Sequence, residues 1–345
     1  LVLYLYLIFN SLISIDMSSG IYRNIGFIRI LILFIAFNFF FNQKAFFNRV
    51  FKFWLITLLI VAFDVFFEYF TGANLLGFPE VRENPRLVSF FKDEPIVGGY
   101  IYGFYLIIIG FLLNKYFLKQ KKVIFALIII LFLAVFLTGE RSSSIKAFVG
   151  IFLLMMFFNK IPRKVKIFSF LLGLLSLTIL VFNSDNFKMR YFVQIKSALD
   201  GERSIYFNLY NSGYQVFKNY PVFGVGNKNY RVETCNDSNN NTEVKLENYI
   251  CTTHPHQIYL EFLSEHGVVG TFIILFVFFK LIFSKIFVVL KNLNYTQIGS
   301  MTFLLLTFLP IIPSGSFFND FAITIFGINL AIFYASNKKF NIFNQ

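Results

Sequence analysis

Residues 123–138 have the sequence VIFALIIILFLAVFLT, sixteen residues without a charged side chain. Lys121 and Lys122 precede this run, and Glu140 and Arg141 follow it. A long apolar run bounded by charges is typical of a helix that crosses a lipid bilayer, for which about 20 apolar residues are needed. A run of sixteen spans the bilayer only with the help of flanking residues or local thinning of the lipid.

Similar runs recur along the chain and predict an all-α, polytopic transmembrane helical bundle of about ten spans. Of the residues, 57% are hydrophobic and only 14% are charged, against about 25% charged in a soluble domain. A soluble fold would therefore lack the polar surface that it needs. The predicted spans are 1–15, 25–41, 51–70, 98–115, 123–138, 145–158, 167–183, 264–284, 298–314 and 318–336.

Charge placement predicts the orientation of these spans. Counted along the sequence, the segments 42–52, 115–122, 159–166, 280–297 and the C-terminal tail hold 16 of the 31 basic residues and none of the 18 acidic ones. Basic loops face the cytoplasm, so the net charge of +13 indicates membrane orientation and not nucleic-acid binding. The chain starts at Leu1 inside an apolar run, so we expect that further helices precede it.

The orientation divides the chain into three predicted parts. Residues 1–183 hold the N-terminal spans with two shorter outer loops, residues 184–263 form one long periplasmic segment, and residues 264–345 hold the C-terminal spans and a cytoplasmic tail. Apolar and aromatic residues recur at helical spacing in the long segment between 206 and 217. This pattern predicts one or two helices at the membrane surface.

Cys235 and Cys251 are the only cysteines, and both lie in the long segment. An oxidising compartment would allow a disulfide between them. Two alternatives remain open: two unrelated thiols, or a zinc site with His254 and His256. The spacing of those four residues is poor for zinc, so no metal is predicted.

The three histidines, His254, His256 and His266, lie within thirteen positions. A histidine at the membrane surface can titrate near neutral pH and act as a general base. His256 is the favoured candidate of the three. The alternative, commoner for any one histidine, is a surface residue that hydrogen-bonds a loop.

Three arginines fall on the same predicted side of the membrane: Arg141, Arg203 and Arg86. The guanidinium group grips phosphate through paired N–H donors. Together with a histidine, these arginines predict a site for a diphosphate-bearing lipid. For Arg141 the alternatives are an ion pair with Glu140 or a contact with a lipid phosphate.

Four motifs stand out in the sequence. They are Thr138-Gly-Glu-Arg141, Arg203 followed by Asn219-Tyr-Pro-Val-Phe-Gly224-Val-Gly226, His254-Pro-His-Gln-Ile-Tyr-Leu-Glu261 with the later Glu265, Gly267 and Gly270, and, more weakly, Arg86 to Gly99. These motifs resemble the O-antigen ligase and polymerase superfamily of bacterial membrane glycosyltransferases. The resemblance covers most of the chain from about residue 80. Gln257 stands where the family usually has Asn, and Ser142 stands where it often has Gly.

The resemblance implies about twelve spans in the whole protein, and an enzyme of the bacterial inner membrane with a periplasmic active face. Such an enzyme moves a glycan from undecaprenyl diphosphate to an acceptor sugar hydroxyl, without nucleotide sugar, metal or other cofactor. His256 matches the catalytic histidine, and Arg141 and Arg203 would hold the diphosphate. The matching positions that could support the site are His254, Gln257, Glu261, Gly224 and Gly226.

Two alternatives to ligation onto a lipid A core remain open. A polymerase of O-antigen or exopolysaccharide repeat units would use the same donor and join it to another carrier-linked glycan. A transporter or flippase for a lipid-linked glycan would place polar groups near the bilayer midplane. Asp64 and Glu68, one turn apart in the span 51–70, could line such a path, although a buried structural role is favoured for them.

Overall fold

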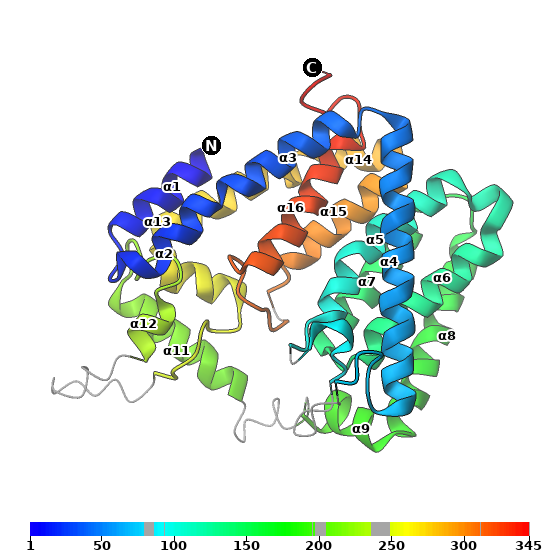
Figure 1. Ribbon diagram of the computed structural model, residues 1–345, viewed down its shortest axis with the longest axis horizontal. Coiled ribbons are helices and arrows are strands. Elements are labelled where there is room, and N and C mark those ends of the chain that lie inside the picture. The colour runs from blue at the N-terminus through cyan, green and yellow to red at the C-terminus, as the bar shows by residue number, and fades with distance from the viewer. Residues whose placement is uncertain are drawn as a thin grey trace. The chain divides into compact units, whose positions relative to one another are not determined.

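The computed structural model describes residues 1–78, 86–92, 94–194, 196, 205–235, 249–310 and 312–344. Every regular element in these residues is helical (Figure 1). The all-α prediction is therefore confirmed for the part of the chain that is described. Helices follow because lipid offers the backbone N–H and C=O groups no hydrogen-bond partner. In a helix these groups bond to each other, from residue i to residue i−4.

The chain forms two compact units, and each is described by itself. Unit 1 combines residues Leu1–Leu33, Ser197–Lys285 and Phe308–Thr324, and unit 2 combines Phe34–Lys196, Ile286–Thr307 and Ile325–Gln345. The helices of unit 1 are α1 (Val2–Leu12), α2 (Met17–Gly26), α11 (Ile205–Asn219), α12 (Tyr230–Thr234), α13 (Ile258–Leu281) and η4 (Phe283–Lys285). Those of unit 2 are α4 (Lys44–Thr71), η1 (Ser89–Phe91), α5 (Val97–Lys115), α6 (Phe117–Leu137), α7 (Arg141–Phe157), α8 (Arg163–Phe182), α9 (Asp185–Lys188), η2 (Met189–Val193), α14 (Ile286–Asn292) and α15 (Tyr295–Thr307). The bounds of α3 (Ile28–Phe40) and α16 (Asp320–Ala335) extend across the division.

Six helical stretches are long and apolar enough to cross a membrane, judged by length and composition, so the chain is a multi-pass membrane protein. They are Met17–Phe40, Lys44–Thr71, Val97–Lys115, Phe117–Leu137, Arg163–Phe182 and Ile258–Asn292. Each of the ten predicted ranges overlaps an observed helix. The number that cross the bilayer stays a prediction, as does the three-part division of the chain.

The centre of unit 2 is α5, most of whose residues are buried. Two glycines bring α5 and α15 into backbone contact. A Cβ on Gly110 would lie 2.2 Å from the carbonyl oxygen of Tyr295, and one on Gly299 would lie 2.2 Å from that of Leu106. Glycine at such crossings lets two helices pack closely inside a membrane.

Two acidic residues near the end of α4 bind the loop that follows it. Asp64 accepts hydrogen bonds from the backbone N–H of Leu75 at 2.7 Å and from the hydroxyl of Ser89 at 2.5 Å. Glu68 accepts from the N–H groups of Val88 and Ser89 at 3.0 and 2.7 Å. Both carboxylates are fully buried and fix this loop, which favours the structural role over a transport path.

In unit 1, α13 is interrupted at Gly267, which has φ +62° and ψ −169°. The turn 221–226 fills the interruption: Val268 N–H donates to the carbonyl of Pro221 at 2.9 Å, and Gly226 N–H donates to that of Glu265 at 2.9 Å. Backbone groups released by the break are thus satisfied. The Pro221–Gly226 turn thus braces the broken helix.

Candidate functional site

His256 lies at the start of α13, one residue before its N-cap Gln257. Its backbone has φ +56°, a left-handed conformation that is uncommon for residues other than glycine. The His256 carbonyl accepts a hydrogen bond from the N–H of Ser314 at 2.9 Å. This bond and the turn hold the backbone of His256 beside the start of α13, and the imidazole is half-buried.

Two rings lie close to the His256 imidazole. The His254 ring centroid is 4.0 Å away, and the Tyr206 ring of α11 is 6.4 Å away at an interplanar angle of 79°. Gly213 lets α11 approach this loop, since a Cβ there would lie 2.6 Å from Cβ of Pro255. The sequence-predicted residues His254 and His256 are therefore adjacent in space.

His254 has a side-chain contact within its own loop. Its Nδ1 lies 2.9 Å from the hydroxyl of Thr253. Burial, with the positive charge of Lys228, lowers the pKa of His254 to about 4. At neutral pH this ring is uncharged, so it offers the His256 imidazole a neutral neighbour.

Glu261 binds a loop that passes beside His256. It is fully buried, and it accepts from the Ser316 hydroxyl at 2.5 Å and from the Phe317 N–H at 2.9 Å. Lys228 lies 3.9 Å from the same carboxylate and donates to Ser316. Glu261 therefore supports the segment from which Ser314 reaches the His256 carbonyl.

Gln257 and the two glycines of the 221–226 turn have structural roles in the backbone around α13. Gln257 caps α13 by accepting from the Leu260 N–H at 2.6 Å, and its amide donates to the carbonyl of Pro310 at 3.0 Å. Gly224 has φ +68°, and a Cβ on it would lie 2.4 Å from the Glu265 carbonyl carbon. Gly226 has φ +100°, so both positions require glycine.

Cys235 and Cys251 form a disulfide, with their Cα atoms 4.6 Å apart. The bridge joins the end of α12 to the segment before α13. It also joins the two thiols to each other, which removes them as zinc ligands. Among the described residues, no group of three or more His, Cys, Asp or Glu side chains has a metal-binding arrangement.

In unit 2, Arg141 is the first residue of α7. Its guanidinium donates to the carbonyl of Arg190 at 3.3 Å. Arg190 is buried and in turn donates twice to the carbonyl of Gly139, at 3.0 and 2.8 Å. Hydrogen bonds from the Arg141 and Arg190 side chains thereby join the Thr138–Arg141 turn to the segment around Arg190.

Glu140 and Arg86 lie in the same part of unit 2. The Glu140 carboxylate accepts from the N–H groups of Gly98 and Gly99 at 2.6 and 3.0 Å. Burial raises the pKa of Glu140, while the Gly98 hydrogen bond and the charge of Arg86 act in the opposite direction. The Nε of Arg86 is buried without a hydrogen-bond partner among the described residues. Arg203 lies outside the described residues.

The structure thus groups the predicted residues within each unit. Unit 1 gathers the two histidines, Gln257, Glu261, the two glycines and the disulfide, and unit 2 gathers Arg86 and Arg141. Sequence analysis missed Arg190 and Lys228, whose partners Gly139 and Glu261 are far away in sequence. A basic residue within the predicted outer segment was the only available signal for either.

A comparison of the sequence with models of protein families gave a match that includes most of the residues described above. Residues 125–275, or 151 of the 345, match the family model described as O-antigen ligase. The match covers Arg141, the 221–226 turn and the two histidines, and it excludes Arg86. A comparison with curated proteins gave no match. Residues 125–275 of this membrane protein are therefore similar to the O-antigen ligase family.

Proposed function

We propose that the protein moves a glycan from undecaprenyl diphosphate to an acceptor sugar hydroxyl at the periplasmic face, as an O-antigen ligase does. The observation that carries this proposal is the placement of His256 inside the family match. Its backbone has a left-handed conformation and accepts the Ser314 hydrogen bond, and its ring centroid lies 4.0 Å from that of His254. A half-buried imidazole at such a position suits a general base.

The proposed reaction is a single displacement. His256 takes the proton of the acceptor hydroxyl while that oxygen bonds to the anomeric carbon. The bond from the anomeric carbon to the diphosphate oxygen breaks, and the lipid diphosphate leaves with the electron pair. Attack opposite the leaving group inverts the anomeric centre.

Arg141, Arg203 and Arg86 are proposed to hold the diphosphate. Paired N–H donors would stabilise the charge that grows on the leaving oxygen. For Arg141, the support is its position at the first turn of α7 beside a fixed turn. For Arg86, it is the buried Nε that lacks a partner among the described residues.

Polymerisation of repeat units is the second candidate, because ligase and polymerase share the donor and differ only in the acceptor. A glycan gel of a strain that lacks this protein separates the two. Full-length polymer that is not attached to lipid A indicates a ligase, and single repeats on lipid A indicate a polymerase. Wild-type glycan in that strain contradicts both.

Complementation of the same strain tests the general base. His256→Ala protein that inserts normally should fail to restore full-length glycan, because the acceptor hydroxyl would keep its proton. Western blotting of the membrane fraction verifies insertion. Full restoration by this variant would exclude His256 as the base.

A conservative substitution tests the diphosphate grip. Arg141→Lys keeps the charge but loses the paired donors, so we expect a loss of most transfer activity, about tenfold or more. Lys218→Gln, a change at an exposed position of α11, is the matched control and should leave the rate unchanged. Unaltered donor turnover in Arg141→Lys would rule out this role.

A further inference from the structure

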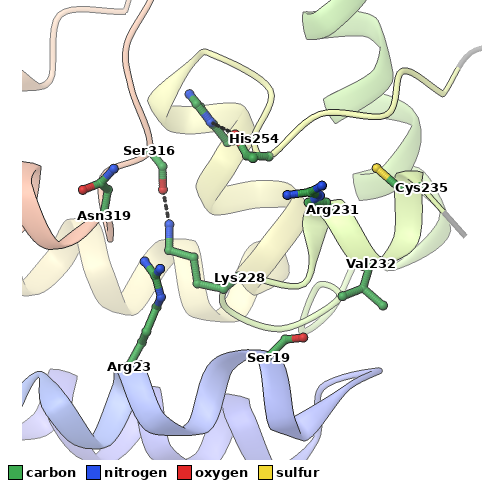
Figure 2. Close-up of a pocket in the computed structure, with 10 residues that line it drawn as sticks. Ser19, Arg23, Lys228, Arg231, Val232, Cys235, His254, Ser316 and Asn319 are labelled. Atoms are coloured by element: carbon green, nitrogen blue, oxygen red, sulfur yellow. Dashed lines mark hydrogen bonds between the residues drawn. The ribbon is translucent and has the colours of Figure 1, made fainter. Parts of the chain in front are cut away.

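A pocket of about 680 Å³ lies in unit 1. Segments far apart in the sequence line it: α2, the stretch around α12, the loop before α13 and the loop before α16 (Figure 2). His254 lines the pocket, and its ring centroid lies 4.0 Å from that of His256 in the same loop. The pocket is therefore a neighbour of the proposed catalytic histidine, and none of the roles proposed above uses it.

Three cations line this pocket: Arg23, Lys228 and Arg231. No aspartate or glutamate is among its described lining residues. The carboxylate of Glu261, which does not line the pocket, lies 3.9 Å from the Lys228 amine and partly neutralises its charge. The side chains of Arg23 and Arg231 are exposed, and neither has an acidic partner within 4 Å in the described part of the chain. Among the described lining residues, positive charge consequently exceeds negative charge.

The fold positions two of these cations, Arg23 and Lys228, close to each other at the pocket wall. Figure 2 shows Arg23 reaching from α2 toward Lys228, whose amine bonds the Ser316 hydroxyl. Lys228 has φ +66°, and only 13% of its side chain is exposed. A turn in an uncommon conformation thus holds a largely buried ammonium group at the pocket wall.

Neutral polar groups lie among the cations. Ser19, Asn319 and Ser316 supply hydroxyl and amide groups to the lining. Burial and the charge of Lys228 lower the pKa of His254 to about 4, so that ring is neutral at pH 7. The volume falls within the range of small-molecule sites and exceeds what a lone phosphate needs. Cations with hydroxyl and amide groups suit a sugar that carries a negative charge.

We propose that this pocket binds an oxyanion carried by a glycan substrate, the carboxylate or phosphate of an acidic sugar. Arg23 and Arg231 would donate charge-assisted hydrogen bonds to its oxygens. Which substrate carries the anion rests on the proposed function. The binding itself does not, so the two can fail separately.

Direct binding to the purified full-length protein tests the pocket. The probes are a disaccharide of glucose and glucuronic acid, the matching neutral glucose disaccharide, and inorganic pyrophosphate, each measured by calorimetry at low and high salt. We expect the acidic disaccharide to saturate and the neutral disaccharide not to bind. Affinity should fall with salt, because exposed charges are screened.

Substitutions assign the binding to this pocket. Arg23→Gln and Arg231→Gln should each weaken binding about tenfold, as expected for one lost charge-assisted bond. Lys218→Gln removes an exposed cation of α11 that stacks on Tyr214 and should leave affinity unchanged. Unfolding temperatures of all three variants verify that the fold is intact.

Each outcome decides the proposal. Saturation by the acidic disaccharide supports an acidic sugar, and saturation by pyrophosphate alone contradicts it. The proposal is overturned if the acidic disaccharide does not saturate, if both arginine variants bind as the wild type does, or if Lys218→Gln weakens binding equally. Wild-type protein that binds the acidic disaccharide but transfers no glycan would count against the proposed function alone.

Discussion

His254 and His256 have neighbouring rings, and burial distinguishes His254 by lowering its pKa to about 4. An unfolded histidine titrates near 6.5. Between those values the unfolded state binds the extra proton, so the His254 contribution to stability is complete above pH 6.5 and is lost as the pH falls toward 4.

This linkage predicts the behaviour of a variant that cannot titrate. His254→Gln should lose less thermal stability between pH 7 and pH 5 than the wild type does. Calorimetric melts at the two pH values measure the difference. An equal loss in both proteins would show that His254 does not carry this part of the pH dependence.

Gly267 provides a second test at the scale of single residues. Its φ is +62°, and a Cβ would lie 2.3 Å from the Val222 carbonyl carbon. Gly267→Ala should therefore destabilise the fold by more than about 1 kcal/mol. Gly173→Ala is the matched control, since its Cβ would meet nothing within 4 Å and alanine favours a helix. Equal melting temperatures for the two variants would contradict the role of the break.

At the scale of elements, the disulfide closes a loop of fifteen intervening residues between α12 and the segment before α13. Loop closure of this length stabilises a fold by about 3 kcal/mol. A reducing agent should lower the unfolding temperature of the wild type and leave that of the double variant Cys235→Ser, Cys251→Ser unchanged. An equal response of both proteins would show that the bridge does not stabilise the native state.

Sequence patterns predicted the elements better than the contacts between them. The 3.6-residue aromatic pattern predicted a helix around 206–217, and α11 covers it. The fit of the 221–226 turn into the break of α13 could not be predicted, because its hydrogen bonds join residues that are more than 35 positions apart. The same holds for Lys228 and Ser316, which come together only in the folded unit.

At the scale of the whole molecule, composition and hydropathy were sufficient for the all-α membrane class. They could not fix how many helices cross the bilayer. Helix α1 has 11 residues and α15 has 13, both shorter than a span requires. Length alone leaves such helices open to tilting, to burial or to an interfacial position.

The predicted orientation has a direct test. Thr253→Cys should react with a membrane-impermeant maleimide added outside intact cells freed of their outer membrane. Lys121→Cys, in a predicted inner loop, should react only after permeabilisation. The two native cysteines are bonded to each other and give no background. Labelling of Lys121→Cys from outside would contradict the orientation.

The most direct measurement of the central claim is glycan transfer by the purified protein. Wild-type protein, given an undecaprenyl-diphosphate-linked glycan and an acceptor, should form the transferred glycan and release undecaprenyl diphosphate. His256→Ala should reduce the rate by roughly 10²–10⁴, and Lys218→Gln should not. Transfer by His256→Ala at the wild-type rate would contradict the claim that this histidine is the general base of a lipid-linked glycan transferase.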